Sequence, residues 1–174
     1  ILDALLAWAR SNGHGDVAAL ADGYMETTLD GVRIDLPGPT GERNQLEFVP
    51  RGTVLCAPND IASLLNQLAA AFATGNRALV LMGTIPALPA AVRERVRFIS
   101  ARELDDSEFA MALVEQGLEG NLRARLAARE GAIVGIVDTR AGVPVALWRL
   151  VAERALCINT TAAGGNASLM TLGL

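Results

Sequence analysis

Lysine is absent from the 174-residue chain: all 15 basic residues are arginine, against 19 acidic residues. Without a lysine amine the chain can form neither a Schiff base with a substrate nor a Walker-type phosphate loop. The net charge of −4 argues against a nucleic-acid-binding domain, because neutralising a phosphate backbone requires a surplus of positive charge. We therefore expect neither lysine chemistry nor nucleic-acid recognition.

Histidine and cysteine are almost as scarce. The only histidine is His14, and the two cysteines, Cys56 and Cys157, are far apart in the sequence. This set leaves no zinc site made by protein ligands alone, and no Ser-His-Asp triad outside the neighbourhood of His14. Both cysteines lie in apolar runs without a neighbouring base, so we expect buried core residues rather than nucleophiles. Two unpaired thiols fit a reducing compartment, which predicts a cytoplasmic protein.

Long hydrophobic runs are also missing. No run reaches the ~18 residues of a membrane-spanning helix, and the longest candidate is broken at 75–77. We expect no membrane span, and peripheral attachment of a parent chain to the inner membrane stays open. The sequence opens at Ile1 without methionine and goes directly into an amphipathic pattern, so we expect a fragment of a longer chain.

The first half of the sequence predicts helices followed by a β-flap. Residues 1–28 have helical periodicity with a polar break at 11–15, so we expect two short helices or one kinked helix. Residues 31–36 and 46–50 alternate between apolar and polar side chains, as strands do. Between them lies a run rich in proline and glycine, so the two strands form a hairpin-like flap with a long tip that projects from the core. The tip residues are Pro37, Gly38, Pro39, Gly41 and Arg43.

From residue 52 onward, continuous apolar segments alternate with helical ones, which is typical of a parallel sheet covered on both faces. Strands are predicted at 53–57, 78–82, 96–100, 132–137 and 155–159. Helices are predicted at 61–74 with Asn59 as N-cap, at 87–95, at 105–116 with Phe109 inward, at 122–129, and at 145–151 with Trp148 in the core. The fold class is therefore α/β: a Rossmann-like, doubly wound, mostly parallel sheet with a projecting β-flap and a small-residue C-terminal tail.

Residue chemistry alone predicts no catalytic, cofactor-binding or metal-binding residue. The turn after the first parallel strand has no glycine, and Asp60 stands where a phosphate would be repelled. A backbone anion site could be suggested at Gly164, Gly165 and Asn166, but this segment is more typical of a turn. The carboxylates at 105–108 fit the N-terminus of a predicted helix, where the helix dipole favours negative charge without a metal ion. The arginines at 93–97 fit the solvent-exposed side of a junction between a helix and a strand better than a phosphate site.

The tail, residues 160–174, is small and uncharged. Such a composition does not make a solvated tail, and it permits a close approach to another protein surface. We therefore expect this segment to dock on a neighbour.

Two segments indicate a family. Residues 36–44 read Leu-Pro-Gly-Pro-Thr-Gly-Glu-Arg-Asn, and residues 157–170 read Cys-Ile-Asn-Thr-Thr-Ala-Ala-Gly-Gly-Asn-Ala-Ser-Leu-Met. They resemble the C-terminal region of the proline utilization A (PutA) family, with Thr161 where an alanine is expected. The family consists of bifunctional flavoenzymes whose proline dehydrogenase and pyrroline-5-carboxylate dehydrogenase modules oxidise proline to glutamate. The resemblance covers essentially the whole chain.

In longer members of that family, this region is a degenerate aldehyde-dehydrogenase-superfamily domain behind the two catalytic modules. Residues 50–59 are similar to the strand and Pro-Trp-Asn turn of working aldehyde dehydrogenases, without the tryptophan. Residues 73–83 are similar to the run that ends in a ribose-binding lysine, but Met82 or Gly83 stands there. The resemblance thus implies a scaffold without its own cofactor, within a parent that uses FAD and NAD.

The resemblance implies four parts: N-terminal helices at 1–30, a β-flap at 31–50, a degenerate Rossmann-like domain at 51–159 and a docking motif at 160–174. It also implies a non-catalytic domain that docks on the catalytic modules of the same polypeptide and helps to close the path of pyrroline-5-carboxylate. Besides the flap tip, the expected contact residues are Asn159, Thr160, Gly164, Gly165, Asn166, Ser168, Leu169, Met170 and Leu172.

Two other functions stay open at this stage. The flap at 32–48 and the tail at 160–172 could exchange between two copies, which would make the chain a homodimerisation module. An NAD-binding dehydrogenase half-domain would have to bind NAD despite the missing glycines and lysine.

Overall fold

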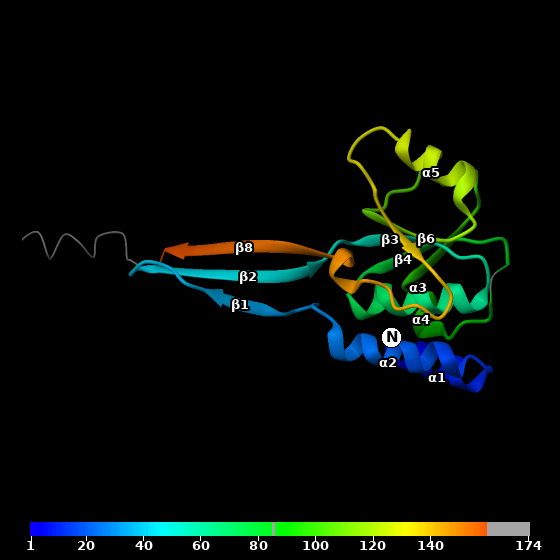
Figure 1. The fold of residues 1–174 in the computed structure, drawn as a ribbon, viewed down its shortest axis with the longest axis horizontal. Coiled ribbons are helices and arrows are strands. Elements are labelled where there is room, and N and C mark those ends of the chain that lie inside the picture. The colour runs from blue at the N-terminus through cyan, green and yellow to red at the C-terminus, as the bar shows by residue number, and fades with distance from the viewer. Residues whose placement is uncertain (85, 160–174) are drawn as a thin grey trace, which may run out of the picture.

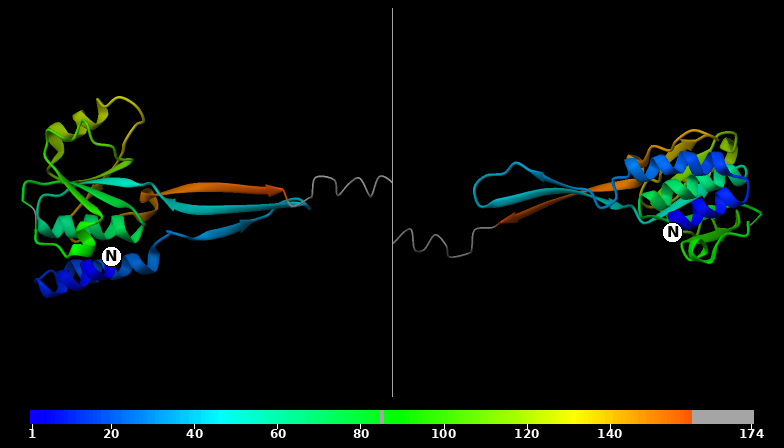
Figure 2. Two further views of the ribbon diagram at one scale, coloured as in Figure 1. Left: turned by 180° about the vertical axis from the view of Figure 1, so that it is seen from behind. Right: turned by 90° about the horizontal axis from the view of Figure 1, so that it is seen from below.

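Two separate sheets organise the chain in the computed structural model, which describes residues 1–84 and 86–159. A five-stranded parallel sheet lies inside a body with helices on both sides, and a three-stranded antiparallel sheet extends away from it (Figure 1). Figure 2 shows the antiparallel sheet standing clear of the body from two further directions. The predicted α/β fold with a projecting flap is confirmed.

The N-terminal residues form α1 (Leu2–Ser11) and α2 (Gly15–Thr27). The chain turns between them at Gly13, whose φ of +82° is a conformation that glycine adopts easily. Arg10 and Asp22 join the two helices with a nitrogen–oxygen distance of 2.7 Å. Of the two predicted forms, the structure has two short helices rather than one kinked helix.

The parallel sheet has the strand order β5-β4-β3-β6-β7. Its direction of growth reverses between β3 and β6, as it does in doubly wound folds. The strands are β3 (Thr53–Ala57), β4 (Arg77–Leu81), β5 (Val96–Ile99), β6 (Met111–Glu115) and β7 (Gly135–Thr139), and the helices that accompany them are α3 (Ile61–Ala73), α4 (Ala90–Arg93) and α5 (Glu119–Ala127).

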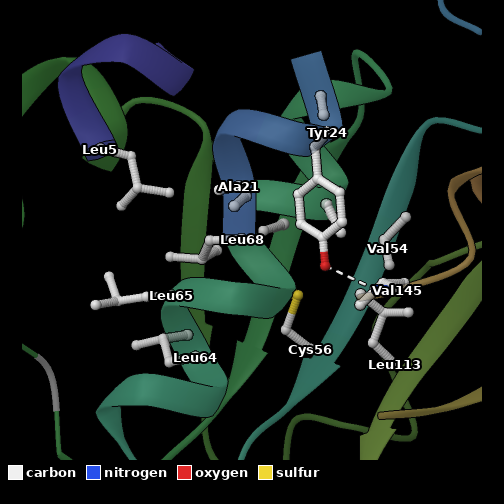
Figure 3. Close-up of a cluster of buried hydrophobic side chains, with 14 of the residues drawn as sticks. Leu5, Ala21, Tyr24, Val54, Cys56, Leu64, Leu65, Leu68, Leu113 and Val145 are labelled. Carbon is white, nitrogen blue, oxygen red and sulfur yellow. Dashed lines mark hydrogen bonds between the residues drawn. The ribbon is translucent and has the colours of Figure 1, made fainter. Parts of the chain in front are cut away.

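Apolar side chains cover both faces of this sheet. On one face, Leu64 and Leu68 of α3 pack between the strands and Leu5 of α1 (Figure 3). On the other, Leu122 and Leu126 of α5 pack against a second buried cluster. Burial on both faces explains why the strands are continuous apolar runs rather than alternating ones.

A polar network lies within the first cluster. The Tyr24 hydroxyl accepts from the Val145 backbone N–H at 2.7 Å (Figure 3). The same hydroxyl donates to Asn66 Oδ1 at 2.7 Å. The Asn66 amide donates to the Val143 carbonyl at 3.1 Å. Burial raises the pKa of Tyr24 to about 12, so the hydroxyl stays protonated and can donate. The network fastens the segment before the 3-10 helix Leu147–Leu150 to α2 and α3.

Replacing Tyr24 by phenylalanine should lower the free energy of unfolding by about 1–3 kcal/mol, because two buried partners lose their hydrogen bond. Urea unfolding measures the difference. Thr27→Ala is the matched control, since its hydroxyl bonds only the Gly23 carbonyl on the exposed side of the same helix. Equal costs for the two variants would contradict the role given to the network.

The flap consists of β1 (Arg33–Leu36), β2 (Glu42–Pro50) and β8 (Val151–Asn159). The hairpin of β1 and β2 was predicted from the sequence and is confirmed. The prediction that 155–159 forms a fifth parallel strand is wrong, because β8 pairs antiparallel with β2 along nine positions, from Val151 opposite Pro50 to Asn159 opposite Glu42. The apolar run at 155–158 does not reveal which sheet it joins.

Other predictions also need correction. The predicted helix at 105–116 is a loop followed by β6, a central strand whose five residues are all buried. Apolar residues at 109, 112 and 113 fit helical spacing, but the run at 111–114 is continuous, as a buried strand requires. The carboxylates at 105–108 therefore precede no helix there, and Asp105 instead pairs with Arg125 at 2.7 Å.

Two residues that were expected in the core are on the surface. Trp148 is 65% exposed, because the predicted helix at 145–151 is only the short 3-10 helix Leu147–Leu150. Cys157 is exposed, because β8 belongs to the flap. Cys56 is buried in β3 as predicted, and burial raises the pKa of its thiol to about 12.

Candidate interaction site

One face of the flap carries apolar side chains from all three strands, with Asn44 and Glu153 also on it. Residues opposite each other in an antiparallel ladder share a face, and the register places Ile34, Leu46 and Ala155 in one row. Leu36 lies on the same face, in the row that ends at Cys157. Ile34 is 44% exposed and Leu36 is 40% exposed. The flap stands clear of the helices and loops of the body in Figures 1 and 2.

On the opposite face, ion pairs connect the three strands. Glu47 of β2 is buried between Arg33 of β1, whose Nε lies 2.8 Å from Oε1, and Arg154 of β8, whose Nε donates to Oε2 at 3.0 Å. The hydrogen bonds from Arg154, then the charges of both arginines, hold the pKa of Glu47 below its usual range. Glu47 thus connects the three strands through one carboxylate. Near the tip, Leu156 and Ile158 are the exposed apolar residues of this face.

The predicted contact residues of the flap gather at its tip. Pro37, Gly38 and Pro39 lie in the exposed connection between β1 and β2, which closes with a hydrogen bond from the Glu42 N–H to the Pro39 carbonyl. Gly41 has φ +91°, and Arg43 lies 3.6 Å from the Asp35 carboxylate.

The start of the predicted docking motif lies at the same end of the molecule. Asn159 is opposite Glu42, so β8 ends at the flap tip. The remaining contact residues lie outside the described residues: Thr160, Gly164, Gly165, Asn166, Ser168, Leu169, Met170 and Leu172.

The carboxyl end of β3 is where doubly wound folds hold a dinucleotide phosphate. Here the Asp60 carboxylate caps α3 and accepts from the Ser63 N–H at 2.7 Å. Asn59, which was predicted as the N-cap, instead donates from its amide to the Gln116 carbonyl at 2.8 Å, so that prediction is wrong. The backbone hydrogen bond from Ser63 is the main reason that the pKa of Asp60 is lowered. A negative charge of the chain itself thus occupies the helix N-terminus.

A chain of buried polar side chains lies beside this end of β3, where the Gln67 amide also lies 3.4 Å from the Ala57 carbonyl. Gln67 of α3 donates to the Thr139 hydroxyl at 2.8 Å, and that hydroxyl donates to the Glu115 carboxylate at 2.5 Å. Glu115 and Thr139 are the last residues of β6 and β7. These three residues were not predicted from the sequence, because a polar residue at the end of an apolar run also fits the start of a loop.

The Asp60 cap makes a prediction about acid stability. Because its folded pKa lies below the ordinary value, its contribution to folding is present above the unfolded pKa and lost as the pH falls through the folded one. Asp60→Ala should cost about 1 kcal/mol at pH 7 and less near pH 3. Urea midpoints at both pH values measure this, with Asp60→Asn as the control that keeps an acceptor. A cost that does not change with pH would contradict the charged cap.

The other candidates form no reactive centre among the described residues. His14 precedes α2, and its ring stacks on Trp8 with centres 6.1 Å apart. No cluster of three His, Cys, Asp or Glu side chains suited to a metal ion occurs in residues 1–84 and 86–159. Among the described helices, none combines the length and the apolar character that crossing a membrane requires.

Comparisons of the sequence find relatives along almost the whole chain. No family model matches it. The chain is 40% identical over 181 residues to the bifunctional protein PutA of Escherichia coli K12, an alignment that covers 99% of this chain and 14% of that protein. It is 39% identical to the bifunctional protein PutA of Rhizobium meliloti, in an alignment that covers 95% of this chain and 14% of that protein. The chain thus spans only a small part of the length of these relatives.

Comparisons of the fold find similar chains among PutA proteins and dehydrogenases. A point mutant of the PutA of Bradyrhizobium japonicum matches with a TM-score of 0.54 and 21% identity, over 72% of this chain and 15% of that one. The PutA of Corynebacterium freiburgense matches with a TM-score of 0.54 and 18% identity, over 84% and 13%. A 3,6-anhydro-L-galactose dehydrogenase matches with a TM-score of 0.50 and 15% identity, over 71% and 30%. The sequence relatives identify this chain as a homologue of one region of the bifunctional PutA proteins, and the solved structures show that it shares its fold with them.

Proposed function

We propose that this chain is a non-catalytic domain of a bifunctional PutA enzyme that oxidises proline to glutamate. It docks on the catalytic modules of the same polypeptide and helps to close the path of the intermediate between them. FAD and NAD serve the catalytic modules, and this domain binds neither.

The uncovered apolar face of the flap is the observation that carries the proposal. A three-stranded sheet is stable when one of its faces is packed against something, and the face with Ile34, Leu36 and Leu46 has no cover from the described body. Exposed apolar patches of this kind are typical of interaction surfaces. We infer that the catalytic modules supply the missing cover.

The state of the dinucleotide crevice supports the absence of catalysis. The Asp60 carboxylate is at the helix N-terminus where a pyrophosphate would need positive partial charge. Gln67, Thr139 and Glu115 fill the adjacent space with hydrogen bonds to one another. Binding NAD would require breaking these contacts and bringing two negative groups together.

The position of Asn159 supports a lid in which flap and tail act together. The strand β8 ends beside the flap tip, at the part of the flap farthest from the body (Figure 1). In this proposal the tail, which follows Asn159 in the sequence, acts on the same surface of the catalytic modules as the flap tip. Excluding water there keeps a reactive intermediate from escaping.

Deleting Ala162 to Leu174 from the complete enzyme tests the proposal. We expect the coupled rate from proline to glutamate to fall several-fold, while each half-reaction measured with its own added substrate stays near the wild-type rate. The thermal unfolding of this domain should not change. An unaltered coupled rate in the deletion variant would mean that the tail closes no path.

Self-association is the second candidate function. In the three-stranded sheet, β1 and β8 each have one edge without a strand neighbour among the described residues, and such edges can pair between copies. Sedimentation equilibrium of the purified chain separates the candidates. A dimer that persists in the presence of the catalytic modules favours self-association, and a dimer that the modules dissociate favours docking.

A further inference from the structure

A groove lies where the flap joins the body. It has a volume of about 690 Å³ and lies between the start of the flap and the 3-10 helix Leu147–Leu150. Its lining includes apolar and charged side chains, among them Phe48, Arg51, Trp148, Arg149 and Glu153. It is separate from both the flap tip and the dinucleotide crevice.

Trp148 gives this groove an aromatic wall. The side chain is 65% exposed, although a tryptophan is among the most costly residues to leave in water. Trp148 also borders a second, mainly apolar groove of about 450 Å³ beside Tyr24 and Leu147. Tryptophan between two hollows is the kind of residue that anchors a partner chain.

Two arginines give the groove a positive side. Arg51 donates from Nε to the Arg149 carbonyl at 2.9 Å, and Arg149 donates from Nη2 to the Ile136 carbonyl at 3.3 Å. The Arg149 guanidinium also lies 5.6 Å from the centre of the Trp148 ring. Both guanidinium groups are thus positioned by neutral partners, and neither forms an ion pair with a carboxylate of the described residues.

The arginines Arg33 and Arg154 of the flap differ from Arg51 and Arg149, because both form ion pairs with Glu47. An oriented guanidinium without an ionic partner binds carboxylates well, because its N–H groups match the two oxygens. Glu153 lines the same groove, which disfavours a ligand with several adjacent negative charges. The charge pattern therefore fits a single carboxylate beside apolar groups.

We propose that this groove binds an extended segment of a partner polypeptide in which one acidic residue is flanked by apolar residues. The carboxylate contacts Arg51 and Arg149, and a flanking apolar side chain packs on Trp148 and Phe48. This site is additional to docking through the flap face and the tail, and its test does not need the catalytic modules.

Fluorescence of Trp148 in the 174-residue chain reports the binding directly. Trp8→Phe removes the only other tryptophan, and its unfolding temperature verifies that the fold is kept. The probes are acetyl-Leu-Asp-Leu-amide and acetyl-Leu-Asn-Leu-amide, which differ only in the charge. We expect a saturable blue shift with the aspartate peptide and affinity about tenfold or more weaker with the asparagine peptide.

Arg51→Gln in the Trp8→Phe background should lower the affinity for the aspartate peptide to that for the asparagine peptide. Arg51 is exposed, so the variant should fold, and Arg33→Gln on the charged face of the flap is the control that should bind normally. Equal shifts with both peptides, no saturable shift with the aspartate peptide, or full affinity in Arg51→Gln would each overturn the proposal.

Discussion

Replacing Ile34 and Leu36 together by aspartate is expected to weaken binding of this chain to the catalytic modules about 100-fold. Burying an apolar side chain of this size contributes about 1.5–3 kcal/mol, and a charge in its place must also be desolvated. Both side chains are about half exposed in the absence of a partner, at 44% and 40%. The unfolding of the body should therefore change little. Calorimetric titration with the separately expressed catalytic portion measures the affinity.

The control for this experiment is on the same strand. Asp35→Asn changes the opposite face of the flap, where the Asp35 carboxylate lies 3.6 Å from the Arg43 guanidinium. We expect this variant to bind within a few-fold of the unmodified chain, because an exposed pair contributes less than about 1 kcal/mol. If the aspartate variant bound as tightly as the control, the apolar face could not be the docking surface.

Leu113→Ala should lower the free energy of unfolding by about 2–5 kcal/mol, the range for a large side chain removed from a rigid core. Leu113 is 0% exposed and lies in the middle of β6, the strand next to β3. Phe109→Ala should cost less, because Phe109 precedes the strand, is partly exposed and packs under the Arg129 guanidinium at 4.5 Å.

Urea unfolding followed by circular dichroism measures both costs. The comparison also distinguishes the strand from the helix that the sequence predicts at 105–116, in which residues 109 and 113 share one inward face. Equal costs at Phe109 and Leu113 would contradict the strand.

Local signals were sufficient for most elements of the body. The break between α1 and α2, the hairpin of β1 and β2, and the strands β3 to β5 were predicted because glycine, proline and periodicity act within a few residues. Segments whose structure depends on distant partners were not. The run 111–115 is a strand because β3 and β7 lie on its two sides, and 151–159 joins the flap because β2 offers it nine partners.

The candidate site was predictable only in part. The flap tip was recognisable from Pro37, Gly38 and Pro39, and the resemblance to the family pointed to the tail. Neither indicates that Asn159 pairs with Glu42, so that β8 ends at the flap tip. Trp148 was assigned to the core because its neighbours are apolar, whereas the structure places those neighbours inside and Trp148 outside. The division into four parts stays a prediction.

Calorimetric titration of the purified chain tests the central claim most directly, with the catalytic portion of the enzyme in one experiment and NAD⁺ in another. We predict saturable binding of the catalytic portion and no heat of binding with NAD⁺, as expected for a docking domain whose crevice is filled by Asp60, Gln67 and Glu115. Saturable binding of NAD⁺, or no binding of the catalytic portion, would contradict the account.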